Sequence, residues 1–151
     1  MKFIENGEEE KAANILKTIN EKIPEDIIPQ YHPQLTLQTG RLYFQLGDTT
    51  EYQRRIDDVL GQENLDEQTL FLIAQELVYT IKDYNKAEQI LLPLYRQDPY
   101  NNRVSGTLVQ LYRETGKYGS ALNILDAWLK IAPNDYQAKA LKTQIEALAN
   151  E

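Results

Sequence analysis

Apolar residues recur at helical spacing along the last third of the chain. Three of them share one face of a predicted helix at i, i+3 and i+4: Leu108, Leu111 and Tyr112. Gly116 interrupts the pattern, as glycine does at helix C-termini. A second apolar stripe then comprises Tyr118, Ala121, Leu125, Trp128 and Leu129. Because Pro133 cannot continue this helix, the pattern predicts two short antiparallel helices joined by a glycine turn.

The same arrangement occurs one period earlier in the chain. A shift of 34 residues superposes seven positions of like character: Leu77 on Leu111, Tyr84 on Tyr118, Ala87 on Ala121, Ile90 on Ile124, Leu91 on Leu125, Leu94 on Trp128 and Pro99 on Pro133. Self-similarity at a fixed period of this length indicates an array of stacked helical repeats.

These residues resemble the tetratricopeptide-repeat family, whose pattern has a tyrosine in the first helix, Gly-x-Tyr at the turn, alanine in the second helix and proline at its end. The last unit fits this pattern at Tyr112, Gly116-Lys117-Tyr118, Ala121 and Pro133. The unit before it has Lys82-Asp83-Tyr84 at the turn, followed by Ala87 and Pro99. The resemblance implies an all-α fold, a right-handed superhelix of antiparallel helix pairs.

An earlier unit departs from the family pattern at one interior position. It keeps Gly40, Tyr43 and Gly47, but it has Tyr52 where alanine is usual. In the family the positions of Gly40 and Tyr52 face each other. We therefore expect the missing side chain of Gly40 to make room for the ring of Tyr52.

The resemblance extends over nearly the whole chain, which we interpret as a single domain, 1–151. We expect a partial repeat over 1–26, a proline-stiffened connector over 27–32, and full repeats over 33–66, 68–101 and 102–135. Pro93 should kink the second helix of the middle repeat. A final helix over 136–149 is apolar on one side only, as expected of a capping helix that shields the last repeat from water.

Composition narrows the chemistry that the chain can perform. A net charge of −7 argues against a nucleic-acid partner, since phosphate binding depends on clustered Lys and Arg. The chain has no cysteine, and its only histidine is His32, which we expect to be an exposed loop residue. Since no phosphate loop, nucleophile motif or metal-ligand cluster occurs, the sequence predicts a protein that is not an enzyme and needs no cofactor or metal.

The resemblance also implies where a protein or peptide partner would bind. In the family, first helices line a concave face, and their outward residues contact ligands. The predicted binding residues are Arg41, Phe44, Gln45, Leu72, Glu76, Tyr79, Arg103, Gln110 and Arg113. The same phase also places Gln34, Leu37, Gln38, Thr69, Ile73 and Thr107 outward. Alternatively, some of these side chains pack against the neighbouring repeat.

A second class of function remains open. The chain could be a structural C-terminal tail of a larger protein, because Phe3 lies in only half of an expected first helix. The region from Gly7 to Gly40 weakly resembles the soluble tails of bacterial multi-spanning, glycosyltransferase-like proteins. No stretch of about 20 apolar residues occurs, so we expect a soluble segment, cytoplasmic or periplasmic, that does not itself insert into a membrane.

Overall fold

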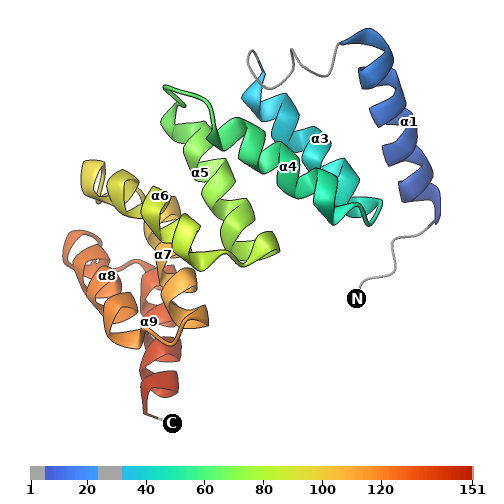
Figure 1. The fold of residues 1–151 in the computed structure, drawn as a ribbon. Coiled ribbons are helices and arrows are strands. Elements are labelled where there is room, and N and C mark those ends of the chain that lie inside the picture. The colour runs from blue at the N-terminus through green and yellow to red at the C-terminus, as the bar shows by residue number, and fades with distance from the viewer. Residues whose placement is uncertain (1–5, 24–31, 151) are drawn as a thin grey trace. The chain divides into compact units, whose positions relative to one another are not determined.

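A computed structural model describes residues 6–23 and 32–150, which form helices joined by short turns and loops, without a strand (Figure 1). The helices are α1 (Asn6–Lys22), α3 (Pro33–Gln45), α4 (Thr49–Leu60), α5 (Glu67–Glu76), the π-helical turn η1 (Leu77–Ile81), α6 (Tyr84–Gln97), α7 (Asn102–Glu114), α8 (Tyr118–Ile131) and α9 (Tyr136–Ala149). The predicted all-α class is confirmed. The right-handed superhelix stays a prediction, and so do the domain and repeat boundaries.

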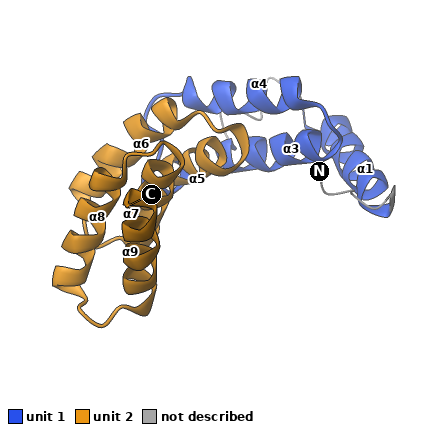
Figure 2. Ribbon diagram, turned by 90° about the horizontal axis from the view of Figure 1, so that it is seen from below, with its two compact units in different colours: residues 1–69 blue, residues 70–151 orange. Residues whose placement is uncertain are grey.

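The chain forms two compact units, Met1–Thr69 and Leu70–Glu151 (Figure 2). Phe3 and most of the predicted connector, residues 27–31, lie outside the described residues. In the part of the chain that the structure describes, no helix is long and apolar enough to cross a membrane.

In unit 1, residues 1–69, α1 and α4 both pack against α3. Apolar side chains from all three helices are buried: Ala12, Leu16, Leu37, Tyr52, Ile56 and Val59. A Cβ atom added to Gly40 would lie 3.3 Å from Cδ2 of Tyr52 and 3.2 Å from Cβ of Arg55. The expected fit between Gly40 and the ring of Tyr52 is therefore confirmed.

A buried arginine was not foreseen from the sequence. Arg55 is only 1% exposed, and its Nε donates to a carboxylate oxygen of Glu51 at 3.0 Å. Its guanidinium also lies over the ring of Tyr43, 5.3 Å from the centroid. Hydrogen bonds from Arg54 and Arg55 hold the pKa of Glu51 below its usual value. Glu51 thus neutralises the buried charge of Arg55, and the cation–π contact with Tyr43 stabilises it further.

In unit 2, residues 70–151, successive helices stack in chain order: α6 on α7, α7 on α8 and α8 on α9. Ala87 and Ala121 are completely buried, as expected of small residues at close helix contacts. Trp128 is 4% exposed, and its Nε1 donates to Oδ2 of Asp135 at 3.1 Å. Asp135 also accepts a hydrogen bond from the backbone N–H of Ala138 at 2.9 Å. One carboxylate therefore joins the core tryptophan to the N-terminus of the final helix.

Three turns between paired helices share a left-handed residue. These residues are Gly47 (φ +82°), Lys82 (φ +62°) and Gly116 (φ +68°). The left-handed conformation costs glycine nothing but crowds the Cβ of any other L-residue. The sequence thus marked two of the turns with glycine, and the third turn forms with a strained lysine.

Pro93 does not end α6, the second helix of the middle predicted repeat. α6 runs unbroken from Tyr84 to Gln97, and Pro93 lies on its exposed side. At that position the backbone loses one hydrogen bond without facing the core. The kink itself stays a prediction.

Candidate partner-binding site

Unit 2 contains a pocket of about 310 Å³ on one side of its helices. It is lined by residues from three segments: Gln75 and Tyr79 of α5 and η1, Asn102, Arg103, Gly106, Thr107 and Gln110 of α7, and Gln137 and Leu141 of α9. Within this unit α7 and α9 lie on one side, and α6 and α8 lie on the other (Figure 2). The pocket therefore opens on the side formed by the first helix of each pair.

Tyr79, Arg103 and Gln110, which the sequence predicts as binding residues, come together in this pocket. Tyr79 is 53% exposed and lies in η1, just before the left-handed turn at Lys82. A large aromatic side chain that is half exposed at a pocket can bury apolar area against a ligand.

Arg103 is held by a ring contact rather than by an ion pair. Its guanidinium carbon lies 4.9 Å from the centroid of the Phe71 ring. Among the described residues no carboxylate pairs with it. The contact with Phe71 orients the guanidinium and leaves its charge without a counter-ion at the pocket.

Gln110 and Arg113 both bond to the next acidic residue of α7. Nε2 of Gln110 donates to Oε1 of Glu114 at 2.6 Å, and Nη2 of Arg113 donates to the same oxygen at 3.3 Å. Arg113 does not line the pocket. Its charge is partly compensated by Glu114, in contrast to the charge of Arg103.

Several residues predicted to point outward are buried instead. Glu76 is only 6% exposed, and its Oε2 accepts a hydrogen bond from Oγ1 of Thr80 at 3.3 Å. Leu72 is half-buried. Leu37 and Ile73, which were also placed outward, are buried in the core. Thr69 and Thr107 are buried as well, although each lines a pocket. The predicted outward face was too wide around each helix, so its edges included positions that face the core.

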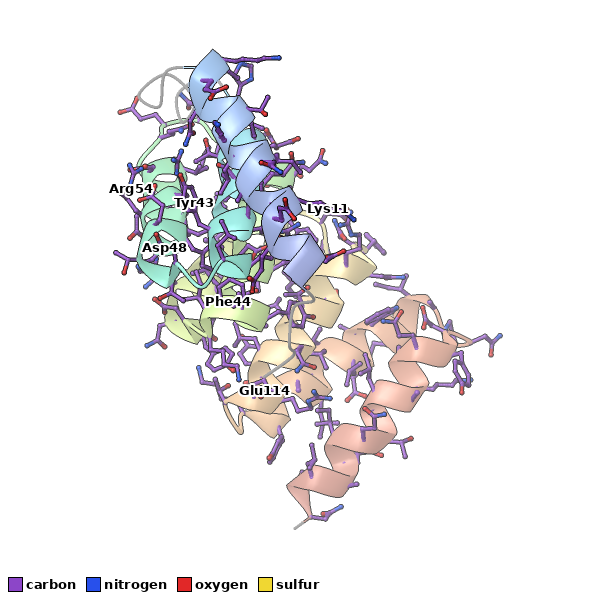
Figure 3. The ribbon with its side chains drawn as sticks, turned by 90° about the vertical axis from the view of Figure 1, so that its right-hand side faces the viewer. Lys11, Tyr43, Phe44, Asp48, Arg54 and Glu114 are labelled. Carbon is purple, nitrogen blue, oxygen red and sulfur yellow. The ribbon has the colours of Figure 1, made fainter. Side chains whose placement is uncertain are left out.

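The other three predicted residues belong to unit 1. Arg41, Phe44 and Gln45 lie exposed near the C-terminal end of α3, with Phe44 next to the turn that contains Asp48 (Figure 3). The ring of Phe44 is tilted against that of Tyr52, with 5.1 Å between the centroids. Phe44 thus packs against the buried Tyr52 and is itself partly exposed to solvent.

Comparison with known proteins finds similarity to tetratricopeptide-repeat sequences. A family model described as tetratricopeptide repeat matches residues 82–145. The chain is also 23% identical over 119 residues to "Tetratricopeptide repeat protein 21B" of Xenopus laevis. That match covers 79% of this chain and 8% of the frog protein, so the chain spans less than a tenth of the relative's length.

The weaker likeness to bacterial glycosyltransferase-like tails is not borne out, because both matches are to tetratricopeptide-repeat sequences. The relative is a frog protein, so a bacterial origin has no support.

The repeat register could have found two pocket residues that the sequence analysis missed. A shift of 34 residues carries Arg103 to Gln137 and Thr107 to Leu141. The face of α7 that lines the pocket therefore continues at the matching positions of α9. Gln75, Asn102 and Gly106 were missed as well, because polar or small residues on a helix carry no apolar pattern that marks them.

The lining of the unit 2 pocket is mostly polar and uncharged. Its lining provides four side-chain amides, one guanidinium, one phenol and one hydroxyl, and it includes no carboxylate. The hydroxyl of Thr107 donates to the backbone oxygen of Arg103 at 2.9 Å. Among the described residues no group of His, Asp and Glu could hold a metal ion. Such a surface can bind by hydrogen bonds, a cation and ring contact.

A second pocket, of about 400 Å³, lies in unit 1 between the start of α3 and the residues before α5. His32 lines it as an exposed residue, as expected, together with Asp66. Asp66 accepts hydrogen bonds from the backbone N–H and the hydroxyl of Thr69, at 2.7 and 3.0 Å, and these lower its pKa. Because Asp66 is thus committed to capping α5, this pocket offers less to a ligand.

Proposed function

We propose that this chain is a non-catalytic tetratricopeptide-repeat scaffold that binds a protein or peptide through the pocket of unit 2. The observation that carries the proposal is the convergence of Tyr79, Arg103 and Gln110 from two successive first helices on one pocket. An exposed aromatic ring and an arginine without a counter-ion are the side chains that most often dominate protein interfaces.

The family supports the same reading, since tetratricopeptide repeats generally mediate protein–protein interaction. A protein ligand is favoured over nucleic acid because the chain carries a net charge of −7 and the pocket holds a single basic residue. The pocket lining holds no histidine, lysine or carboxylate that could activate the hydroxyl of Thr107 or Tyr79, which supports a binding role without catalysis.

The test is affinity capture from lysate of the source cells with the wild-type chain and with the double variant Tyr79→Ala/Arg103→Ala. A matched control, Tyr100→Ala/Lys130→Ala, removes one exposed ring and one exposed cation from outside the pocket. We expect wild type and control to capture the same proteins and the pocket variant to lose them.

A structural role within a larger protein is the competing function. It is favoured by the length of the frog relative, of which the chain matches only 8%. If wild type, pocket variant and control all capture the same proteins, or none captures any, the pocket is not the binding site and the structural role becomes the better explanation.

A further inference from the structure

Gly106 has neither of the usual structural reasons for a glycine. It lies inside α7, between the buried residues Ser105 and Thr107, where backbone entropy disfavours glycine relative to alanine. A Cβ atom at Gly106 would meet nothing within 4 Å, whereas one at Gly40 would touch Tyr52 and Arg55. Its φ is also not positive, unlike those of Gly47 and Gly116. The missing side chain serves neither close packing nor a turn.

What the missing side chain does provide is open space in the lining of the pocket. Gly106 lines the pocket together with Tyr79 and Leu141, whose side chains offer a ring and an aliphatic surface. A ligand side chain with an apolar stem could bury that stem in the space over Gly106.

The charge of the pocket indicates the other end of that side chain. Arg103 is the only charged residue of the lining, and among the described residues its guanidinium has no carboxylate partner. Unit 2 carries nine basic and nine acidic side chains, so the whole excess of −7 belongs to unit 1. Unit 2 therefore has no net charge that would repel an acidic ligand.

We propose that Gly106 determines specificity, by admitting a glutamate side chain of the partner whose carboxylate pairs with Arg103. The inference rests on the proposed binding function and adds to it the chemistry of the residue recognised. The stem of the glutamate lies over Gly106 beside Tyr79 and Leu141, and the guanidinium of Arg103 donates to the carboxylate. The neighbouring amides of Gln75 and Gln137 can bond the partner's main chain.

The experiment uses the full chain and synthetic peptide pools as probes. Each pool contains labelled nine-residue peptides with a fixed central residue, namely Glu, Asp, Gln, Lys or Leu, and mixed flanking positions. Binding is measured by fluorescence anisotropy at low and at physiological salt. We expect the Glu pool to bind about tenfold more tightly than the Gln pool, because a charge-assisted hydrogen bond is lost in the latter. The difference should shrink as salt rises.

Two substitutions separate the role of Gly106 from effects on folding. Gly106→Gln fills the space with a good helix former and should weaken binding of the Glu pool about tenfold or more. Gly119→Gln is the matched control, because Gly119 lies in α8 and likewise has nothing within 4 Å of an added Cβ. Arg103→Gln should abolish the preference for Glu over Gln. Thermal melting of each variant checks that the fold is kept.

The outcomes distinguish the inference from the proposed function. If pools bind and Tyr79→Ala weakens them, but Glu is not preferred or Gly106→Gln binds like wild type, the inference is wrong and the binding site stands. If no pool binds the wild-type chain, the inference is overturned, and lysate capture then decides the proposed function alone. A preference for Glu that is lost in both Gly106→Gln and Arg103→Gln, and kept in Gly119→Gln, establishes it.

Discussion

Nζ of Lys117 lies 3.0 Å from Oε2 of Glu88, so an ion pair joins the start of α8 to α6 of the preceding repeat. The ammonium also lies over the ring of Tyr112, 5.7 Å from its centroid. The hydrogen bond from Lys117 is the main cause that lowers the pKa of Glu88, and a hydrogen bond from Tyr112 adds to it. Burial, followed by the hydrogen bond to Glu88, raises the pKa of Tyr112 to about 12. Three side chains from α6, α7 and the turn before α8 thus act as one cluster.

This cluster predicts how stability depends on pH. Because the folded pKa of Tyr112 is raised from 10.0 to about 12, its contribution is complete below pH 10 and is lost as pH rises toward 12. The lowered pKa of Glu88 acts in the opposite direction: its contribution is present above pH 4.5 and is lost as pH falls through the folded pKa. Tyr112→Phe keeps the buried ring and removes the hydroxyl, so it should cost about 1 kcal/mol at neutral pH.

Urea unfolding of wild type and Tyr112→Phe at pH 7, 10 and 11.5 checks this expectation. The difference in unfolding free energy should shrink at pH 11.5, because the phenol of the unfolded chain is then largely ionised while the folded phenol, with its raised pKa, still resists ionisation. Comparing the two proteins cancels the titration of the other tyrosines and lysines. A difference that stays constant with pH would show that the hydroxyl of Tyr112 is not coupled to Glu88.

A second prediction concerns the left-handed turn at Lys82. Gly47 and Gly116 occupy the matching turns, so Lys82→Gly should relieve the strain of φ +62° and stabilise the fold by about 1 kcal/mol. Lys82→Ala removes the same charge but keeps a Cβ, and therefore should give no comparable gain. Thermal melting of both variants decides between strain and charge, because an equal gain in both would exclude strain as the cause.

A side chain added at Gly40 should destabilise unit 1 by steric crowding. Gly40→Ala gains about 0.5–1 kcal/mol of helix propensity. The new Cβ, however, would sit 3.2–3.3 Å from Arg55 and Tyr52, and overpacking of this kind costs about 1–3 kcal/mol. We expect a net loss of about 1 kcal/mol in chemical denaturation. Gly106→Ala is the control, since the same change in open space should be neutral or stabilising.

Among these substitutions, removal of the Trp128 side chain should cause the largest loss in free energy of unfolding. Trp128→Ala removes a ring that is 4% exposed and should cost about 3–5 kcal/mol. Trp128→Phe keeps most of the apolar contact but leaves Oδ2 of Asp135 without its donor, so the loss should be clearly smaller. The unfolding midpoints of both variants, measured in urea, test whether packing or the hydrogen bond dominates. Equal losses would assign the stability to the bond.

The repeat pattern predicted the helices well because it depends on properties that sequence carries directly. Tyr112, Ala121 and Trp128 are buried as their spacing requires, and Gly47 and Gly116 mark their turns by their left-handed conformation. Lys82 shows the limit, because a strained residue at an equivalent turn leaves no trace in composition. The packing of neighbouring helices determines such a backbone conformation, and the pattern of residue types does not reveal it.

The lining of the candidate pocket was predictable only in part, for a related reason. Spacing placed Tyr79, Arg103 and Gln110 on one face, and the pocket brings all three together. Burial at the edge of that face depends on neighbouring helices, so Glu76 was placed outward although it is buried. Gln137 and Leu141 were within reach of the 34-residue register, but the final helix was read only as a cap.

The last prediction ranks the contributions of Tyr79 and Arg113 to binding, which the sequence pattern did not distinguish. Tyr79 lines the pocket and is half exposed, so its ring can bury apolar area against a ligand. Arg113 lies outside the lining, and Glu114 already accepts its hydrogen bond at 3.3 Å. We expect Tyr79→Ala to weaken binding of a captured partner by about 2 kcal/mol or more, and Arg113→Ala by less than about 1 kcal/mol. Dissociation constants from titration calorimetry test the order. If Arg113→Ala costs more than Tyr79→Ala, the partner binds along the C-terminal end of α7 and not in the pocket.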